Sequence, residues 1–456
     1  MQESPTGSLP GREAPRPEGT GPEAPRPEGT GPEGTARRPR LSRRGLLTGG
    51  ALTAVGALAA CAPEKDASRL PAPGAAAARQ VTGEGSPGQG TGRATAVPGG
   101  VATEPFHGAH QAGIATAPQT YGIFVGLDLL PDTDREAITR MMRLLTDDAL
   151  RLTEGRPALA DTEPELADLP SRLTVTFGFG PGLFTAAGLE DHRPESVAPL
   201  PSFKIDKLRK EWSGGDLLLQ ICADDALTLS HALRMTVKDA RSFAKVRWTQ
   251  RGFRRSPQTQ DPGLTQRNVM GQLDGTVNPK PGTPDFDRAV WVSDGPEWLR
   301  GGTTLVLRRI RAEMETWDAV DTVGKEFTVG RRLDTGAPLT GQREHDEADF
   351  GKLNATGFPV ISEQAHIRRA HVTDPGMRIF RRPYNYDEGL TEQGHSDSGL
   401  LFASYQADIA RQFIPIQKRL AEADLLNEWT TPIGSAVFAI PPGCSAGGWI
   451  GETLLS

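Results

Sequence analysis

Cysteine, tyrosine and long apolar runs are scarce in this chain of 456 residues. Three cysteines are too few for a fold held together by disulfides. No apolar run reaches the ~18–20 residues that a membrane-spanning helix needs. Positive charge is also in deficit, since 51 Lys and Arg stand against 57 Asp and Glu, a formal net charge of −6. This acidic balance argues against a nucleic acid as the main partner.

Aromatic residues are missing from the first 104 residues, although the chain contains 27 of them. The same stretch is rich in glycine and proline, and residues 13–32 repeat one ten-residue unit twice. Such a composition buries too little apolar surface to offset the entropy cost of ordering the chain. We therefore interpret residues 1–36 as a disordered extension.

Residues 37–62 have the features of an export signal. A basic cluster that includes Arg43 and Arg44 precedes an uncharged, mostly apolar stretch. It resembles the twin-arginine signal, whose machinery exports proteins already folded around a cofactor; an ordinary secretory signal is the alternative. Cys61 follows Leu-Ala-Ala, which fits either a lipobox with an acylated cysteine or cleavage by the ordinary peptidase. Residues 63–104 are then a flexible linker, and we expect an extracellular, cell-envelope or periplasmic protein, anchored to the membrane if Cys61 is acylated.

Hydrophobic periodicity in the rest of the chain predicts two similar sets of elements. The first set is strand 121–129, helix 134–152, strands 173–177 and 216–222, helix 225–240 and strand 244–250. The second set is strand 303–310, helix 317–331, strands 377–380 and 399–405, helix 408–426 and strand 436–441. Each has the βαββαβ order of a ferredoxin-like domain with an antiparallel sheet. The fold class is therefore α+β, with domains at 105–290 and 291–456 and a boundary in the Pro- and Gly-rich stretch 280–300.

Three segments contain residues that could carry chemistry. Residues 268–279 are glycine-rich with a lone acid, Asp274, in a Gly-x-x-Asp-Gly pattern that is also a common turn. Residues 365–371 contain His366 and His371, and a histidine can ligate iron when its other ring nitrogen is held by an acceptor. In residues 377–386, Arg381 and Arg382 stand beside two tyrosines. By itself each segment is more often structural than functional.

In their order, these segments resemble the dye-decolourising peroxidase family, whose members are haem enzymes of two ferredoxin-like domains of the dimeric α+β barrel type. Further matching segments are His110-Gln-Ala-Gly-Ile, Thr174-Val-Thr-Phe-Gly-Phe-Gly, Val246-Arg-Trp and Gly399-Leu-Leu-Phe-Ala-Ser-Tyr-Gln. The resemblance covers nearly all of residues 105–442. The export signal is similar to that of the exported branch of the family, which also includes deferrochelatase-like proteins.

The resemblance implies a role for each segment. His366 is then the proximal iron ligand, Asp274 and Arg381 lie on the peroxide side, and Gly275, Thr276 and Val277 lie against the macrocycle. A carboxylate base and a fixed guanidinium are suited to proton transfer and to stabilising negative charge during peroxide cleavage. A carboxylate base works in mildly acidic solution, so we predict an acidic pH optimum. Two alternatives stay open: Arg381 as a partner of a haem propionate, and His371 as the axial ligand.

The resemblance therefore implies a haem peroxidase that reduces hydrogen peroxide through a ferryl intermediate and oxidises dyes, phenols or another one-electron donor. The cofactor is haem b, bound non-covalently, since no Cys-x-x-Cys-His motif occurs. A haem-handling protein of an iron-uptake system, a deferrochelatase, is the second hypothesis, and a secreted scaffold without cofactor is the third. We further expect the twin-arginine machinery as a partner and association into a homo-oligomer.

The remaining aromatic, cysteine and histidine side chains are interpreted as follows. Bulky donors require surface aromatics for electron transfer, for which Tyr384, Tyr386 and Trp317 are candidates, although buried packing is the more common use of such side chains. Cys222 lies in an apolar run and is interpreted as a buried free thiol. The remaining histidines are expected on the surface or in loops; these are His107, His110, His192, His231, His345 and His395.

Overall fold

The computed structural model describes residues 99–261 and 263–456, and most of the predicted elements are present there. The strands are β1 (Tyr121–Leu129), β2 (Thr174–Phe179), β3 (Leu217–Ala223), β4 (Ala244–Phe253), β5 (Thr303–Ala312), β6 (Phe380–Arg381), β7 (Tyr384–Leu390), β8 (Ser396–Gln406) and β9 (Thr430–Ile440). The helices are α1 (Arg135–Thr153), α2 (Pro181–Ala186), α3 (Ala226–Ala240), α4 (Pro284–Val290), α5 (Met314–Asp318), α6 (Thr322–Val329), α7 (His366–Ala370), α8 (Ile414–Ala423) and α9 (Glu452–Leu455). The repeat, the export signal, Cys61 and most of the predicted linker lie outside the described residues.

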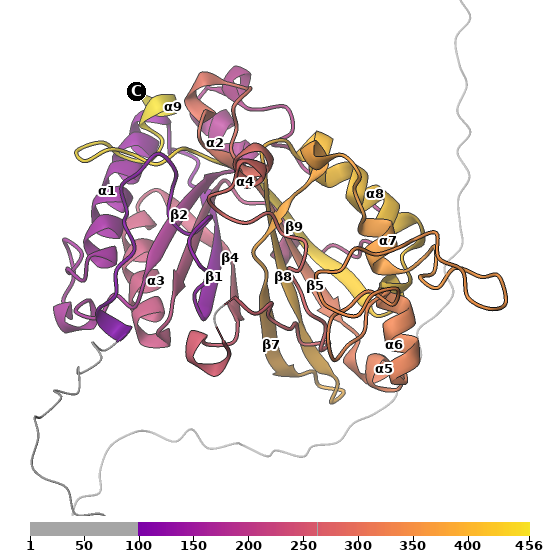
Figure 1. Ribbon diagram of the computed structural model, residues 1–456. Helices are drawn as coiled ribbons and strands as arrows, with labels where there is room; N and C mark the ends of the chain where they lie inside the picture. Colours follow the sequence, from indigo (N-terminus) through magenta and orange to yellow (C-terminus); the bar gives the residue numbers. More distant parts are fainter. Residues whose placement is uncertain (1–98, 262) are drawn as a thin grey trace, which may run out of the picture. The chain divides into compact units, whose positions relative to one another are not determined.

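The strands form two ferredoxin-like sets that join into a closed ring. The first set pairs in the order β2-β3-β1-β4 and the second in the order β9-β5-β8-β7, all antiparallel. One bridge joins β2 to β9 at Phe179 and Ala439, and another joins β4 to β7 at Phe253 and Asn385. Figure 1 shows the strands between α1 and α3 on one side and α5 to α8 on the other. The predicted α+β fold of barrel type is confirmed.

Both faces of β2 and β3 are buried, because the ring has a packed interior as well as helices outside. Inside the ring, Phe124, Trp248, Tyr405 and Phe438 belong to one cluster. The ring of Trp248 lies against Gly126, where a Cβ atom would come within 2.4 Å of it. Strand β3 therefore reads as a continuous apolar run rather than an alternating one.

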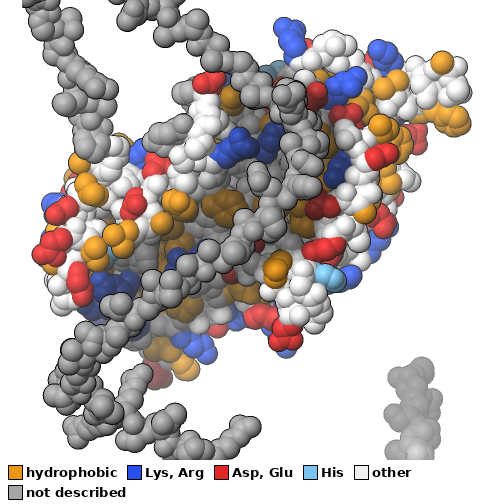
Figure 2. Space-filling view, turned by 90° about the horizontal axis from the view of Figure 1, so that it is seen from below, with side chains coloured by type: hydrophobic (Ala, Val, Ile, Leu, Met, Phe, Trp, Pro, Cys, Tyr) orange, Lys and Arg blue, Asp and Glu red, His pale blue; other side chains and the backbone are white. Residues whose placement is uncertain are grey.

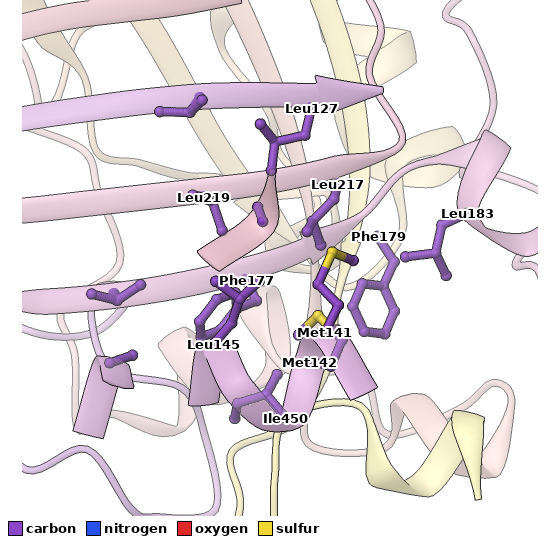
Figure 3. Close-up of a cluster of buried hydrophobic side chains, with 14 of the residues drawn as sticks. Leu127, Met141, Met142, Leu145, Phe177, Phe179, Leu183, Leu217, Leu219 and Ile450 are labelled. Atoms are coloured by element: carbon purple, nitrogen blue, oxygen red, sulfur yellow. The ribbon is translucent and has the colours of Figure 1, made fainter. Parts of the chain in front are cut away.

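The other faces of β1, β2 and β3 pack against α1 and α3. Met141, Met142 and Leu145 of α1 are fully buried and meet Phe177 and Leu217 of the sheet (Figure 3). Asp134 caps this helix by accepting a hydrogen bond from the backbone N–H of Ala137 at 2.9 Å. Helix α1 thus begins where the sequence predicts, and its apolar face anchors the N-terminal half.

Three predictions for the second half were wrong in detail. The expected helix 317–331 is two helices, α5 and α6, because Asp321 starts a new helix by capping the N–H of Gly324. The expected helix 408–426 is a π-helical turn at Ile409–Phe413, then α8, then a 3₁₀ turn. The expected strand 377–380 is mostly irregular: Met377 ends a 3₁₀ turn that begins at Pro375, and only Phe380 is in a strand, β6. The strand that pairs with both β4 and β8 is β7.

Surface charge is mixed in sign. On the visible part of the face in Figure 2, acidic and basic side chains are interspersed rather than gathered by sign. Within residues 99–261 and 263–456, no helix is long and apolar enough to cross a bilayer.

Two carboxyl groups meet between α1 and α3, and they make folding stability depend on pH. Asp148 is fully buried, and Asp148 and Asp239 each keep one buried oxygen without a hydrogen-bond partner among the described residues. Burial, followed by the neighbouring Asp148, raises the pKa of Asp239 to about 7. The folded protein therefore holds a proton that the unfolded chain releases near pH 4, so this contribution to stability is lost as pH rises from about 4 to 7.

We expect Asp239→Asn to remove this loss. The free energy of unfolding at pH 8, relative to that at pH 5, should rise by about 1–2 kcal/mol compared with the unchanged protein. Urea unfolding at both pH values measures the effect, with the exposed Glu136→Gln as the control. An equal pH dependence in the protein with and without Asp239 would show that the two carboxyl groups do not share a proton.

Candidate functional site

A cavity of about 920 Å³ lies in the C-terminal half, between the sheet and helices α7 and α8. Its apolar wall comes from Ile310 of β5, Leu400 and Phe402 of β8, and Ile416 and Leu420 of α8. The volume is near the upper end of the range of about 300–1,000 Å³ for small-molecule and cofactor sites. The cavity is therefore large enough for a bulky, largely apolar ligand.

His366 lines one side of the cavity as the first residue of α7. Its Nδ1 atom lies 2.6 Å from Oδ2 of Asp424, a carboxylate that is almost fully buried at the end of α8. Burial alone would lower the pKa of His366, but Asp424 outweighs it and the pKa is raised. Because Nδ1 is held by the carboxylate, Nε2 is left to bind a ligand or a metal.

Asp274 and Arg381 also line the cavity and form an ion pair. Nη1 of Arg381 donates to Oδ1 of Asp274 at 2.7 Å, with 7% of the aspartate side chain and 22% of the arginine side chain exposed. Asp274 lies in the loop between β4 and α4, and Arg381 is in β6. A charge-assisted hydrogen bond of this kind fixes both groups and keeps the carboxylate beside a cation.

The residues after Asp274 continue along the cavity wall. Gly275, Thr276 and Val277 all line it. Gly275 has a φ of 127°, which an L-residue with a side chain would adopt only with strain. The hydroxyl of Thr276 donates to a carboxylate oxygen of Glu344 at 2.9 Å. This loop therefore presents backbone and small side chains to a ligand in the cavity.

The structure thus brings together every site residue that the sequence predicted. His366, Asp274 and Arg381 come from three segments up to 107 residues apart, and all border one cavity. Three further arginines border it as well: Arg308, which pairs with Asp206, and Arg331 and Arg378, which can meet carboxylate groups of a ligand. The site therefore combines an imidazole whose Nδ1 is held by a carboxylate, a second carboxylate that can act as acid or base, and a fixed guanidinium. This combination is suited to proton transfer on a metal-bound substrate.

Two residues of the site were missed from the sequence. Asp424 was placed only at the end of a predicted helix, and Asn278 within a turn. Nothing in their local sequence indicates a role, because each acts on a partner about 58 or 103 residues away. A search for acidic residues at the ends of helices that face the predicted histidine would have found Asp424.

The other histidines compete poorly with His366. His371 borders the cavity, but it is exposed, and its ring packs against Phe350 with centroids 5.0 Å apart. The prediction for His231 was wrong: this residue is buried in α3, and its Nε2 atom lies 2.8 Å from Asp161. Within the described part of the chain, no group of three or more His, Cys, Asp or Glu side chains is arranged to hold a metal ion.

The three aromatic candidates for electron transfer are buried, which is the alternative that the sequence favoured. Tyr384 and Tyr386 are fully buried in the interior of the ring, and Trp317 is 1% exposed. They lack direct access to a donor in solution. Cys222 is a buried free thiol, as predicted, and burial raises its pKa.

Comparison with known proteins identifies relatives over nearly the whole described region. Residues 111–254 match the family model of the Dyp-type peroxidase N-terminal domain, and residues 265–445 match that of the C-terminal domain. The chain is 40% identical over 361 residues to a dye-decolorizing peroxidase of Thermobifida fusca, covering 76% of this chain and 84% of the relative. It is 36% identical over 371 residues to a deferrochelatase of Yersinia pestis, covering 77% and 85%.

Solved structures with a similar fold include DyP-type peroxidases. A DyP-type peroxidase from Cellulomonas bogoriensis superposes with a TM-score of 0.77 at 52% identity, covering 79% of this chain and all of the other. The oxyferrous complex of DtpA from Streptomyces lividans superposes with a TM-score of 0.76 at 41% identity, covering 78% and 98%.

Proposed function

Because this chain belongs to the Dyp-type peroxidase family, we propose that it reduces hydrogen peroxide with haem b, bound non-covalently, and oxidises dyes, phenols or another one-electron donor. The observation that carries the proposal is the arrangement around one cavity, with His366 held by Asp424 and with Asp274 paired to Arg381.

The residues of the cavity fit a haem group. His366 offers Nε2 to the iron, since Nδ1 is engaged by Asp424. The apolar wall suits the porphyrin, Gly275 lets the backbone approach it, and Arg331 and Arg378 can pair with its propionates. When bound, haem supplies the redox chemistry: it delivers two electrons to peroxide and recovers them singly from a donor.

Asp274, Arg381 and Asp424 then have separate roles in the reaction. With hydrogen peroxide in the cavity, Asp274 would accept a proton from one of its oxygens and return it to the other, so that this oxygen can leave as water. Arg381 holds the Asp274 carboxylate in place at 2.7 Å and stabilises the negative charge that develops as the O–O bond breaks. Asp424 keeps the His366 ring in one orientation and strengthens it as a ligand.

We expect Arg381→Leu to slow the reaction with peroxide more than it weakens haem binding. The rate constant should fall by about 10²–10³-fold, because a fixed cation is lost where charge develops. Stopped-flow absorbance measures the rate, and haem titration of the apoprotein measures binding. The exposed Arg140→Leu is the control. If haem binding falls as much as the rate does, Arg381 serves a propionate instead.

Deferrochelatases among the relatives make release of iron from haem the second candidate function. Product analysis separates the two. Repeated turnover of peroxide with the haem intact is the result expected for the peroxidase. Stoichiometric free protoporphyrin, without turnover of peroxide, would overturn it. A purified protein without a Soret band would remove both candidates.

Export and assembly are also part of the proposal. The paired arginines at 43 and 44, before an apolar stretch, support export by the twin-arginine route. We further propose an extracellular, envelope or periplasmic location, an acyl anchor at Cys61 as one outcome of processing, and a homo-oligomeric state. The apparent mass of the mature protein and its fractionation with or without membranes test these points.

A further inference from the structure

The Asp274–Arg381 pair rests on two segments with little regular structure of their own. Asp274 lies in a loop between β4 and α4, in which an isolated bridge joins Arg267 to Leu273. Arg381 belongs to β6, which has two residues and pairs with β8 at Tyr405 and Ser404. A hydrogen bond of 2.7 Å between such segments needs something that fixes their backbones relative to each other.

Asn278 makes this connection. Its Nδ2 atom donates to the carbonyl oxygen of Arg381 at 2.6 Å, and the backbone N–H of Arg381 donates to its Oδ1 atom at 3.1 Å. The backbone N–H of Asn278 in turn donates to the carbonyl of Gly275 at 2.9 Å. Asn278 therefore links Gly275, the residue after Asp274, to Arg381: its own N–H bonds to Gly275, and its side chain bonds to the backbone of Arg381.

Asn385 makes the reciprocal contact from the other segment. The backbone N–H of Val269 donates to its Oδ1 atom at 3.0 Å, and its Nδ2 atom donates to the carbonyl of Arg267 at 3.4 Å. Asn385 is in β7, four residues after Arg381, and Val269 lies five residues before Asp274. The two segments are thus joined by an asparagine from each.

A primary amide is the side-chain group that presents a donor and an acceptor side by side, as a backbone peptide does. Aspartate would keep the acceptor and lose the donor, and alanine would lose both. On this basis we propose that Asn278 is a positioning residue for the Asp274–Arg381 pair, with Asn385 as its counterpart. The inference rests on the proposed peroxidase function for its consequence and on the hydrogen bonds alone for its geometry.

A double-mutant cycle tests the consequence. Asn278→Ala should lower the rate constant with hydrogen peroxide by about tenfold or more, because small displacements of a catalytic group are costly. In an Arg381→Leu background the same change should cost less than about twofold, since the ion pair that Asn278 positions is already broken. Asn354→Ala, which removes an asparagine that bonds within an exposed loop, is the control. Equal losses in both backgrounds, or a loss no greater than that of the control, would overturn the role.

Hydrogen exchange tests the geometry without reference to activity. In Asn278→Ala the amide of Arg381 should exchange at least about tenfold faster, because its acceptor is removed. The amide of Arg382 donates to Ala403 at 2.9 Å and should keep its protection. Unchanged exchange at Arg381 would show that Asn278 does not fix the backbone of Arg381. Faster exchange with an unchanged peroxide rate would instead overturn its importance for the reaction.

Discussion

Asp274→Asn should lower the rate constant for the reaction with hydrogen peroxide by about 10²–10⁴-fold while the protein keeps its haem. Asparagine has nearly the same shape and can still accept a hydrogen bond from Arg381, but it cannot take up a proton. The loss therefore reports on proton transfer rather than on the shape of the cavity. Stopped-flow absorbance at the Soret band measures the rate, and the ratio of Soret to protein absorbance measures haem content.

The pH profile makes this prediction sharper. The rate of the unchanged protein should be highest in mildly acidic solution, and Asp274→Asn should lose this pH dependence. Asp132→Asn, in an exposed loop, is the matched control. A rate of the unchanged protein that rises at pH 7 and above would contradict a carboxylate base.

His366→Ala should remove most of the bound haem. The imidazole borders the cavity with Nε2 left to bind iron, and its Nδ1 bond to Asp424 holds it in place. The Soret absorbance per protein should fall to a small fraction of its normal value, and peroxide turnover should be lost with it. Asp424→Asn should be intermediate, with haem affinity lowered by about 10–100-fold, because it removes the acceptor but keeps the ring.

His371→Ala is the matched control, since this histidine lies five residues further on and borders the same cavity. It should keep a normal Soret band. If His371→Ala loses haem and His366→Ala keeps it, the ligand has been assigned to the wrong residue.

Much of the fold was predictable because its local signals agree with its tertiary structure. Strand β1 and helix α1 begin and end within a residue of the predicted positions, since hydrophobic periodicity and the Asp134 cap point to the same element. The failures lie where tertiary contacts decide. Residues 377–380 were predicted as a strand, yet Asp374 and Pro375 start a 3₁₀ turn that reaches Met377, and only Phe380 of the four is in a strand.

In the site, too, residues with a recognisable local sequence were predicted, and residues that act through distant contacts were not. Asp274, His366 and Arg381 were found because their segments resemble a known family in type and order. Asp424 and Asn278 were not, because their roles consist of single hydrogen bonds to residues far away in the chain. The burial of Tyr384 and Tyr386 could not be derived from their local sequence either. Both follow a pair of arginines and have a polar context, yet both side chains lie inside the ring.

A crystal structure of the purified, haem-containing protein tests the central claim most directly. The account predicts iron bound by Nε2 of His366, with the carboxylate of Asp274 and the guanidinium of Arg381 on the opposite face of the porphyrin. Iron bound by His371, or Asp274 and Arg381 on the same face as the ligating histidine, would contradict it.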